Sequence, residues 1–303
     1  MYDLIIIGAG PGGLTAGIYA ARSRCKALLI EKEMIGGQIA SSDVIENYPG
    51  FPTISGAGLM ELFEAHAKGA GLEIKFSEAQ NITLDGNVKV IKTPEGELRA
   101  KAVIISTGAK PKRLGVPGEK EYTGKGVSYC ATCDGPFFRG RAVMVVGGGD
   151  TAIKEAVYLS KLASKVYIVH RRDRFRAEKI HEEKARGAGN VEFLTSHVLK
   201  EIKATDGLVS SAIVGDLKST AVKDVPVEGV FVFVGINPTT DFVDVDKDEA
   251  GFIKTNHEMQ TSVPGIYAVG DCRVTPLRQV STAVGDGAFA AHAAGEYIEN
   301  FKP

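Results

Sequence analysis

The N-terminal part of the chain alternates between short apolar runs and a glycine-rich turn. Leu4–Ile7 is an apolar run that fits a buried strand, and a glycine turn follows it directly. The pattern then predicts a helix over Leu14–Arg22 and a second buried strand over Ala27–Ile30, which ends at the acidic residue Glu31. A strand, a helix and a second strand in this order form a βαβ unit.

The same pattern returns near the middle of the chain. Val143–Val146 is an apolar strand, glycines follow at 147–149, Thr151–Leu162 fits a helix and Val166–Val169 fits a second strand. The two segments align without a gap at an offset of 139 residues, 147 minus 8. The alignment pairs Gly8 with Gly147, Gly10 with Gly149, Gly13 with Ala152, Tyr19 with Tyr158 and Glu31 with His170. The sequence therefore predicts an α/β fold with two Rossmann-like, mononucleotide-binding units in one chain.

Three further apolar runs end in glycine, which is typical of strands that end at a ligand-facing turn. They are Ala102–Gly108, Gly229–Gly235 and Gly265–Gly270. If the last run returns to the first unit, the second unit is an insertion, entered near Gly115–Glu119 and left near Asn237-Pro238. Pro and Gly at both crossings suit a two-stranded hinge. We expect the first domain to span 1–114 and 241–303 and the inserted domain to span 115–240.

The segment Leu72–Ala102 shows a looser alternation of apolar and polar residues. Turn residues interrupt it at Asp85-Gly86 and at Glu95-Gly96. We interpret this segment as a small antiparallel β element.

Composition and charge exclude several classes of protein. The 303 residues suggest two domains, and 44% hydrophobic with 24% charged residues is ordinary for a globular protein. A formal charge of −1 gives no general attraction to nucleic acid or an anionic membrane, and no apolar run approaches the ~18 residues of a membrane span. The N-terminus, with Asp3 and no basic segment, does not resemble a secretory signal. We expect a soluble cytoplasmic protein that binds neither nucleic acid nor membrane.

The first glycine motif, Gly8-x-Gly10-x-x-Gly13, follows a predicted strand and opens a predicted helix. The first glycine permits a tight turn, the second lets the backbone approach a pyrophosphate, and the third lets the helix pack on the strand. Glu31 lies 23 residues after Gly8, where a carboxylate accepts hydrogen bonds from an adenosine ribose. The combination favours dinucleotide binding over a glycine-rich turn without a ligand.

The second motif, Gly147-x-Gly149-x-x-Ala152, has basic residues where an NAD site has an acid. His170, Arg171 and Arg172 stand there, and Arg174 and Arg176 follow. Guanidinium groups bind a 2′-phosphate bidentately, whereas an acid would repel it, so the sequence favours NADPH over NADH. The alternative is a solvated basic start of a helix over Asp173–Lys179.

Cys130-Ala131-Thr132-Cys133-Asp134 is a third candidate site. The two sulfurs of a C-x-x-C in a helical turn are near enough to form a disulfide, and an adjoining carboxyl can act as acid or base toward a thiolate. A zinc site would need further ligands. The remaining cysteines, Cys25 and Cys272, are isolated, so a redox dithiol is favoured over a metal site.

Asp271 ends the apolar run Ile266–Gly270. It could hydrogen-bond a polyol chain, and the alternative is a helix cap or a turn aspartate. The Ala- and Gly-rich run Ala283–Gly295 that follows fits a helix packed under a cofactor.

Eight motifs occur in order across nearly the whole chain. They are GAGPGG at 8–13, GGQ at 36–38, ENYPGF at 46–51, CATCDG at 130–135, GGGDTA at 147–152, HRRDRFRA at 170–177, GD at 270–271 and RQ at 278–279. Together they resemble the low-molecular-weight, bacterial or archaeal type of thioredoxin reductase, a family of homodimeric flavoenzymes that use NADPH and FAD. The place of CATCDG just before the second glycine motif separates this family from disulfide reductases whose cysteines lie near the N-terminus.

The resemblance implies FAD on the first unit and NADPH on the second. The residues implied for FAD are Gly8, Gly10, Pro11, Gly13, Glu31, Lys32, Gly36, Gly37, Gln38, Asn47, Gly108, Asp271, Arg278, Gln279 and Ala283. Those implied for NADPH are Gly147, Gly149, Asp150, Thr151, His170, Arg171, Arg172 and Arg176. Asp150 departs from relatives that often carry Ser or Asn there, and an acid near the pyrophosphate would weaken NADPH binding.

The resemblance also implies a mechanism. Hydride would pass from NADPH to FAD and electrons then to a Cys130–Cys133 disulfide, with Cys133 facing the flavin and Asp134 acting as acid or base. Cys130 would attack the disulfide of thioredoxin or of a thioredoxin-like dithiol protein. Because Cys133 lies only 14 residues before Gly147, the disulfide and the nicotinamide site belong to one domain. We therefore expect rotation about the two crossings to bring them to the flavin in turn.

Three alternatives remain open from the sequence. A dithiol oxidase or a ferredoxin-linked reductase could use the same scaffold, although the intact GGGDTA motif and the arginine cluster argue against both. A non-enzymatic reading, a flavin-bound redox sensor or a zinc-clipped assembly module, would require that the cysteines do not cycle.

Overall fold

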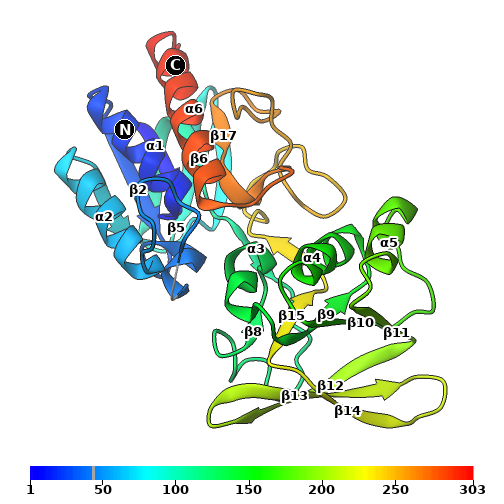
Figure 1. Cartoon of the computed structure of the whole chain (residues 1–303). Helices are drawn as coiled ribbons and strands as arrows, with labels where there is room; N and C mark the ends of the chain where they lie inside the picture. The colour runs from blue at the N-terminus through cyan, green and yellow to red at the C-terminus, as the bar shows by residue number, and fades with distance from the viewer. Residues whose placement is uncertain (43–44, 303) are drawn as a thin grey trace. The chain divides into compact units, whose positions relative to one another are not determined.

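The computed structural model describes residues 1–42 and 45–302. The chain folds into two compact units, of which unit 2, Pro111–Ile236, is coloured green to yellow in Figure 1. Unit 1 consists of Met1–Lys110 and Asn237–Pro303. The predicted α/β fold class, with the second unit inserted into the first, is confirmed. Both crossings lie four residues before the expected limits, since unit 2 begins at 111 rather than 115 and ends at 236 rather than 240.

Within the described residues, unit 1 is built on a seven-stranded sheet. Its order is β3-β2-β1-β6-β5-β4, and β17 pairs with β6 outside this path. The strands are β1 (Tyr2–Ile7), β2 (Ala27–Glu31), β3 (Glu73–Phe76), β4 (Asn81–Asp85), β5 (Val88–Thr93), β6 (Gly96–Ile105) and β17 (Ile266–Ala268). β4, β5 and the start of β6 pair antiparallel, as the alternation over Leu72–Ala102 predicts, whereas β3 pairs in parallel with β2. The antiparallel element is continuous with the parallel sheet because β6 also pairs in parallel with β1 and β17.

Strand β1 shows why the parallel part of this sheet is apolar along its whole length. Leu4 and Ile6 pack into one apolar cluster, and Ile5 and Ile7 pack into a second one on the other face. A parallel strand covered on both faces requires such a continuous apolar run. The helices of unit 1 are α1 (Pro11–Arg22), α2 (Gly56–Gly69) and α6 (Val280–Glu299), and α1 and α6 lie side by side (Figure 1).

Two glycines allow α1 and α6 to approach closely. A Cβ atom added at Gly287 would lie 2.2 Å from the carbonyl oxygen of Gly12, and one added at Gly12 would lie 3.1 Å from the carbonyl oxygen of Ala283. Such distances exclude a side chain at Gly287 unless the backbone moves. The contact holds the N-terminal ends of α1 and α6 next to each other, which brings the first glycine turn beside the start of α6.

Unit 2 has three layers. Its central sheet, in the order β11-β10-β9-β15-β8, is parallel throughout. One face packs against a three-stranded antiparallel sheet and the other against helices. The strands are β8 (Val127–Ser128), β9 (Ala142–Gly147), β10 (Lys165–His170), β11 (Val191–Thr195), β12 (His197–Thr205), β13 (Leu208–Asp216), β14 (Val222–Pro226) and β15 (Gly229–Phe233), and the helices are α3 (Ala131–Asp134), α4 (Asp150–Ser160) and α5 (Lys179–Arg186).

The chain crosses between the units on two short paired strands, β7 (Ala109–Pro111) and β16 (Ile236–Pro238). The N–H of Lys112 donates to the carbonyl oxygen of Gly235 at 2.9 Å, and the N–H of Thr239 donates to that of Gly108 at 3.1 Å. The segment Gly115–Glu119, where the sequence suggests a hinge, lies inside unit 2 instead. The buried carboxylate of Glu119 closes the segment into a turn by accepting the N–H groups of Leu114 and Gly115 at 3.0 and 2.7 Å. The hydroxyl of Tyr129 donates to the same carboxylate at 3.0 Å and ties the turn to unit 2.

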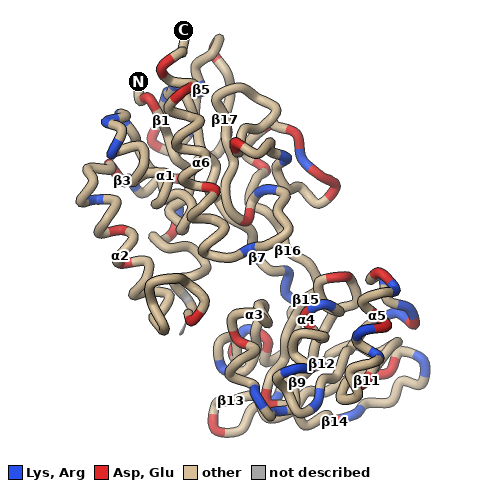
Figure 2. Tube along the Cα trace, turned by 45° about the horizontal axis from the view of Figure 1, so that its top comes forward, with Lys and Arg blue, Asp and Glu red and all other residues tan. Residues whose placement is uncertain are grey.

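Charges are interspersed along the trace of both units (Figure 2). In residues 1–42 and 45–302, no helix combines the length and the apolar composition that a membrane span requires.

Candidate active site

The first glycine turn joins β1 to α1. Gly8 has a left-handed φ of +104°, and a Cβ there would lie 2.4 Å from the carbonyl oxygen of Ser106. A Cβ at Gly13 would lie 1.9 Å from the carbonyl oxygen of Gly8, so only glycine lets the helix pack this close to the strand. At Gly10, by contrast, no atom of the described residues other than its chain neighbours lies within 4 Å of the Cβ position. Gly10 precedes α1 without a side-chain cap, so the open backbone and the first N–H groups of the helix fit a pyrophosphate.

Glu31 is held beside this turn by two backbone groups. Its Oε2 accepts the N–H of Ala9 at 2.7 Å, and its Oε1 accepts the N–H of Glu33 at 2.8 Å. These bonds orient the carboxylate and leave lone pairs that can accept ribose hydroxyls. Lys32, the next residue, forms an ion pair with Glu78 at 2.6 Å.

The predicted Gly36-Gly37 pair returns to the same turn. The N–H of Gly36 donates to the carbonyl oxygen of Ala9 at 2.8 Å, and a Cβ at Gly37 would lie 3.8 Å from the Cα of Gly10. Both glycines have left-handed φ values, +105° and +61°. They begin a short 3₁₀ helix, Gly37–Ser41, next to the open side of Gly10.

Gln38 and Gly108 meet near the carboxyl end of β6. The Nε2 of Gln38 donates to the carbonyl oxygen of Ala109, and Gly108 has a φ of +64°. The sequence motif GGQ and the glycine after β6 therefore lie together in unit 1.

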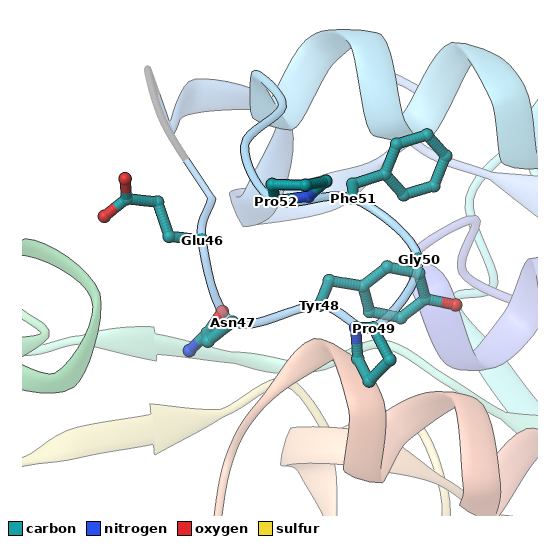
Figure 3. Close-up of a pocket in the computed structure, with 7 residues that line it drawn as sticks. All are labelled: Glu46, Asn47, Tyr48, Pro49, Gly50, Phe51 and Pro52. Atoms are coloured by element: carbon teal, nitrogen blue, oxygen red, sulfur yellow. The ribbon is translucent and has the colours of Figure 1, made fainter.

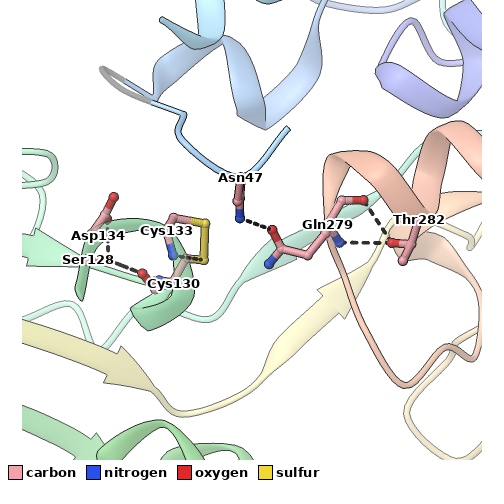
Figure 4. The surroundings of a disulfide bond; sticks show 7 residues. All are labelled: Asn47, Ser128, Cys130, Cys133, Asp134, Gln279 and Thr282. Atoms are coloured by element: carbon pink, nitrogen blue, oxygen red, sulfur yellow. Dashed lines mark hydrogen bonds between the residues drawn. A yellow bond between two sulfur atoms is a disulfide. The ribbon is translucent and has the colours of Figure 1, made fainter. Parts of the chain in front are cut away.

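Asn47 contacts a residue far away in the sequence. Its Nδ2 donates to the Oε1 of Gln279 at 3.0 Å, and Gln279 in turn caps α6 through reciprocal bonds with Thr282 (Figure 4). The loop Glu46–Pro52 that carries Asn47 curves around a pocket of about 510 Å³ (Figure 3). Two predicted motifs, ENYPGF and RQ, are thus joined directly.

Asp271 and Arg278 lie close enough in unit 1 for their charges to interact. Burial raises the pKa of the Asp271 carboxyl, and the positive charge of Arg278 opposes this shift. Burial also lowers the pKa of Arg278, whose guanidinium lies 4.4 Å from the centroid of the Phe252 ring. Among the described residues, the buried Nε of Arg278 has no hydrogen-bond partner. A half-buried carboxylate and an orphaned donor fit a polar ligand such as FAD.

The turn that carries Asp271 is fixed by residues that the sequence analysis did not select. The Oδ2 of Asp286 accepts the N–H of Gly270 at 3.0 Å and the Nε of Arg273 at 2.9 Å. Gly270 also lies against the predicted site residue Ala283, since a Cβ there would lie 3.4 Å from the Ala283 Cβ. An acidic residue within an Ala- and Gly-rich helix was the only sequence signal for Asp286.

The second glycine turn joins β9 to α4 with the same backbone arrangement. A Cβ at Gly147 would lie 2.4 Å from the carbonyl oxygen of Phe233 and 2.7 Å from the Cβ of Ala152. Gly149, like Gly10, has no atom from the described part of the chain, apart from its chain neighbours, within 4 Å of its Cβ position, and it precedes α4 without a side-chain cap. Thr151 is exposed in the first turn of α4. This turn also fits a pyrophosphate.

His170, at the position that corresponds to Glu31, is buried. Its ring stacks on Phe175 at 5.3 Å between centroids, and a Cβ at Gly148 would lie 2.2 Å from its Nδ1. Burial lowers the pKa of His170, and the charges of Arg172, Arg176 and Arg171 lower it further. A hydrogen bond that the ring donates to the backbone carbonyl oxygen of Arg174 opposes this shift. The ring is therefore neutral and packs under the glycine turn.

The segment between β10 and α5, residues 171–178, is called the arginine loop below. It carries Arg171, Arg172, Arg174 and Arg176, all of them exposed. In the part of the chain that the structure describes, none of the four forms an ion pair. Because α5 begins at Lys179, these arginines precede the helix rather than start it, and they are available to an anion.

Cys130 and Cys133 form a disulfide at the start of α3, with 5.4 Å between their Cα atoms (Figure 4). The N–H of Cys133 also donates to the Sγ of Cys130 at 3.2 Å. No group of metal-ligating side chains occurs in the described residues. The disulfide fits the predicted redox pair.

Cys25 and Cys272 are free thiols. Burial raises the pKa of each to about 11. Neither forms an appreciable amount of thiolate near neutral pH, so the reactive sulfur chemistry belongs to Cys130 and Cys133.

Ser128 links the disulfide to Asp134. Its Oγ donates to the Oδ2 of Asp134 at 2.5 Å and accepts the N–H of Cys130 at 3.0 Å (Figure 4). Ser128 lies at the end of β8 and is buried. No sequence pattern marks Ser128 as a site residue, because a lone serine two residues before a cysteine carries no motif of its own.

A model of the pyridine nucleotide-disulphide oxidoreductase family matches residues 2–287. The chain belongs to this family. A thioredoxin reductase of Bacillus subtilis is 44% identical over 304 residues, which cover 100% of this chain and 96% of that protein. A thioredoxin reductase of Peptoclostridium acidaminophilum is 46% identical over 312 residues and covers 100% and 99% of the two chains.

Solved structures of the same family resemble the whole chain. The crystal structure of thioredoxin reductase from Streptococcus pyogenes is 45% identical, has a TM-score of 0.94 and covers 99% of each chain. The resemblance inferred from the sequence motifs is thus confirmed at the level of the family and of the fold.

Proposed function

We propose that this chain is a thioredoxin reductase, which takes electrons from NADPH through FAD to the Cys130–Cys133 disulfide and then to thioredoxin. The observation that carries this proposal is the disulfide itself, which lies in the same unit as the arginine loop. Full-length similarity to thioredoxin reductases supports the same activity.

The cofactor assignment rests on the two glycine turns. FAD, when bound, supplies two-electron transfer between NADPH and the disulfide. In unit 1 the turn at Gly10 would hold its pyrophosphate, Glu31 its adenosine ribose, and Asp271 and Arg278 more distal polar groups. In unit 2 the turn at Gly149 would hold the pyrophosphate of NADPH, and the arginine loop its 2′-phosphate.

The disulfide residues complete the reaction. Two electrons and two protons convert the Cys130–Cys133 disulfide to two thiols. The Cys130 sulfur then attacks the disulfide of thioredoxin to form a mixed disulfide, and Cys133 displaces the thioredoxin sulfur, which regenerates the internal disulfide. Asp134 gives or takes the protons that these thiols exchange, and thioredoxin leaves as a dithiol.

Both reactive centres of unit 2 have to serve one flavin. Since the disulfide and the second glycine turn belong to unit 2 and the first glycine turn belongs to unit 1, we include a rotation about the β7 and β16 crossings in the proposal. Full turnover of a chain whose units are locked by an engineered crosslink would contradict this step.

We also propose that the working form is a cytoplasmic homodimer. Large apolar side chains are exposed on helices of unit 1, among them Tyr19 on α1 and Phe289 on α6, and a second copy would cover such groups. Light scattering after size-exclusion chromatography should give twice the mass of the 32.1 kDa chain.

An anaerobic absorbance titration tests the activity. NADPH should bleach the flavin, NADH should do so far less effectively, and oxidised thioredoxin should restore the colour. Bleaching by a dithiol or by reduced ferredoxin, with none by NADPH, would instead support one of the alternative electron donors.

A Cys130→Ser variant separates the two halves of the reaction. NADPH should still reduce its flavin, but thioredoxin reduction should be abolished because the attacking sulfur is missing. Unimpaired thioredoxin turnover in this variant would contradict the roles given to the cysteines.

A further inference from the structure

Asp150 stands where a negative charge is unexpected. It is the first residue of α4 and follows the open backbone of Gly149 directly. A carboxylate there repels the phosphates of a nucleotide by its charge. Its Oδ1, however, accepts the backbone N–H of Glu178 at 2.8 Å, and Glu178 is the last residue of the arginine loop.

This hydrogen bond is one of several that fasten the arginine loop. The N–H of Arg176 donates to the carbonyl oxygen of Gly148 at 2.7 Å, and the carbonyl oxygen of Arg172 accepts the N–H of Ser196 at 3.0 Å. The bonds from Arg176 to Gly148 and from Glu178 to Asp150 therefore tie the second half of the loop to the glycine turn and the helix that follows it. The distance between the pyrophosphate turn and the guanidinium groups depends on these two bonds.

The charge of Asp150 is accommodated by the two helices that meet there. Asp150 lies in the first turn of α4, and Glu178 immediately precedes α5. The positive ends of both helix dipoles stabilise an anion at this point. The carboxylate thus has a structural reason to be next to a phosphate site.

We propose that Asp150 is a positioning residue for NADPH, which holds the arginine loop at the distance that lets its guanidinium groups reach the 2′-phosphate. This inference rests on the proposed function, because it takes the second glycine turn as the NADPH site. It predicts that losing the hydrogen bond costs affinity for the 2′-phosphorylated nucleotide specifically, whereas charge repulsion alone would predict tighter binding without the acid.

Binding of NADP⁺ and NAD⁺ to the oxidised holoenzyme, measured by calorimetry, tests this without any turnover. Asp150→Ala should raise the dissociation constant of NADP⁺ about tenfold and leave that of NAD⁺ within about twofold. Asp150→Asn keeps an acceptor oxygen and should bind NADP⁺ like the wild type. Asp173→Ala removes the same charge from the exposed part of the loop and serves as the matched control.

Two results would overturn the proposal. Equal or tighter NADP⁺ binding by Asp150→Ala would mean that repulsion dominates, and an equal loss for NADP⁺ and NAD⁺ would mean that only the pyrophosphate turn is affected. A wild type that does not prefer NADP⁺ over NAD⁺ would overturn the NADPH assignment together with this inference. A wild type that does prefer NADP⁺, with an Asp150→Ala variant that keeps this preference, would overturn the role of Asp150 alone. Thermal unfolding of each variant checks that the fold is intact.

A second inference comes from the separate network around the disulfide. Ser128 accepts the N–H of Cys130 and donates to Asp134, so one hydroxyl connects the backbone of the disulfide turn with the neighbouring carboxylate. The Oγ has one proton and two acceptors within reach, and the Oδ2 of Asp134 at 2.5 Å is closer than the carbonyl oxygen of Cys130 at 3.2 Å. We propose that Ser128 is a positioning residue that orients Asp134 for proton exchange with the cysteine pair, which again rests on the proposed function.

A double-mutant cycle with a pH profile tests this role. Ser128→Ala should lower kcat/KM for thioredoxin about tenfold and shift the acidic limb of the profile to higher pH by about one unit, because the carboxylate loses a donor. In an Asp134→Asn background the same substitution should cost less than about twofold. Ser128→Thr keeps the hydroxyl and should restore most of the activity.

An equal loss in both backgrounds, or a loss with no shift of the profile, would overturn this role and indicate that Ser128 acts through the fold alone. A wild type that does not reduce thioredoxin with NADPH would contradict the proposed function itself.

Discussion

The two glycine turns share a backbone but differ in the side chains around it. Gly8 and Gly147 both crowd a neighbouring strand, and Gly10 and Gly149 are both open. Strands β1 and β9 each end in such a turn. The strand that follows each of them ends in Glu31 in unit 1 (β2) and in the buried His170 in unit 2 (β10). The shared backbone fits the pyrophosphate common to both nucleotides, and in the proposed function the strand end and the loop behind it discriminate between them.

The third position of the motif separates the two turns further. A Cβ at Gly13 would lie 1.9 Å from a backbone oxygen, whereas unit 2 already has the Cβ of Ala152 at the equivalent position. Helix α1 therefore lies closer to β1 than α4 lies to β9. The same motif tolerates a methyl group in one unit and excludes it in the other.

Substitutions at Gly13 and Ala152 should give the largest difference in stability between the two units. Gly13→Ala should destabilise unit 1 by about 3 kcal/mol, since the backbone has to move, and should release the flavin. Ala152→Gly removes one buried methyl group and adds a helical glycine, so it should cost only about 1 to 2 kcal/mol. Thermal unfolding and the flavin content of the purified variants measure both. A flavin-loaded Gly13→Ala protein of wild-type stability would refute the difference between the turns.

The proposed role of the residues that follow β10 can be tested by comparing the binding of NADP⁺ and NAD⁺. Replacing both Arg171 and Arg172 with Ala should weaken NADP⁺ binding up to about 100-fold, since charge-assisted bonds to a phosphate are lost, and leave NAD⁺ binding unchanged. Arg186→Ala, whose arginine pairs with Glu182 in α5, is the control and should change neither constant. Calorimetry at low and high salt should show that the difference shrinks as salt screens the charges.

Whether a feature could be predicted from the sequence depends on how far apart along the chain the interacting residues lie. The two βαβ units and the cysteine pair are encoded within short segments, so periodicity and spacing were sufficient. The bond from Glu178 to Asp150 spans 28 residues and that from Asn47 to Gln279 spans 232, and no local pattern announces either. Only folding brings these partners together.

At Gly115–Glu119 a local sequence pattern is present, but the hinge that it predicts does not occur there. Glycine and proline there suggested a flexible crossing, but the buried Glu119 fixes the segment to unit 2 through three hydrogen bonds, two from backbone N–H groups and one from the Tyr129 hydroxyl at 3.0 Å. A carboxylate that is buried because of its partners looks like a surface residue in the sequence.

The units also differ in the charge that they bury, an anion at Glu119 in unit 2 and a cation at Lys89 in unit 1. Glu119→Gln replaces one acceptor oxygen with a donor that faces an N–H group, and we expect a loss of about 2 to 3 kcal/mol. Because burial and Glu119 together raise the pKa of Tyr129 to about 12, the variant should also lower that value. Denaturant unfolding and ultraviolet titration of the phenols measure the two effects, and Glu183→Gln on the surface of α5 is the control. An unchanged midpoint would mean that water satisfies these backbone groups.

The buried cation should leave a smaller, pH-dependent signature. Lys89 donates to the carbonyl oxygen of Asn87 at 2.9 Å and to the hydroxyl of Tyr297 at 2.8 Å, and burial lowers its pKa to about 8. Between pH 8 and the ordinary lysine value of 10.5, the unfolded chain binds more protons than the folded one, so this group makes the protein more stable as the pH rises. From pH 8 to pH 9.5 the gain should be about 1 to 2 kcal/mol. Buried thiols and phenols act in the opposite direction, because their raised pKa values favour unfolding over the same pH range. The wild type therefore has to be compared with a Lys89→Met variant, since both proteins contain these thiols and phenols and their contributions cancel in the difference. The stability difference between the two proteins should change by that amount over this range, and a constant difference would show that Lys89 remains fully charged in the fold.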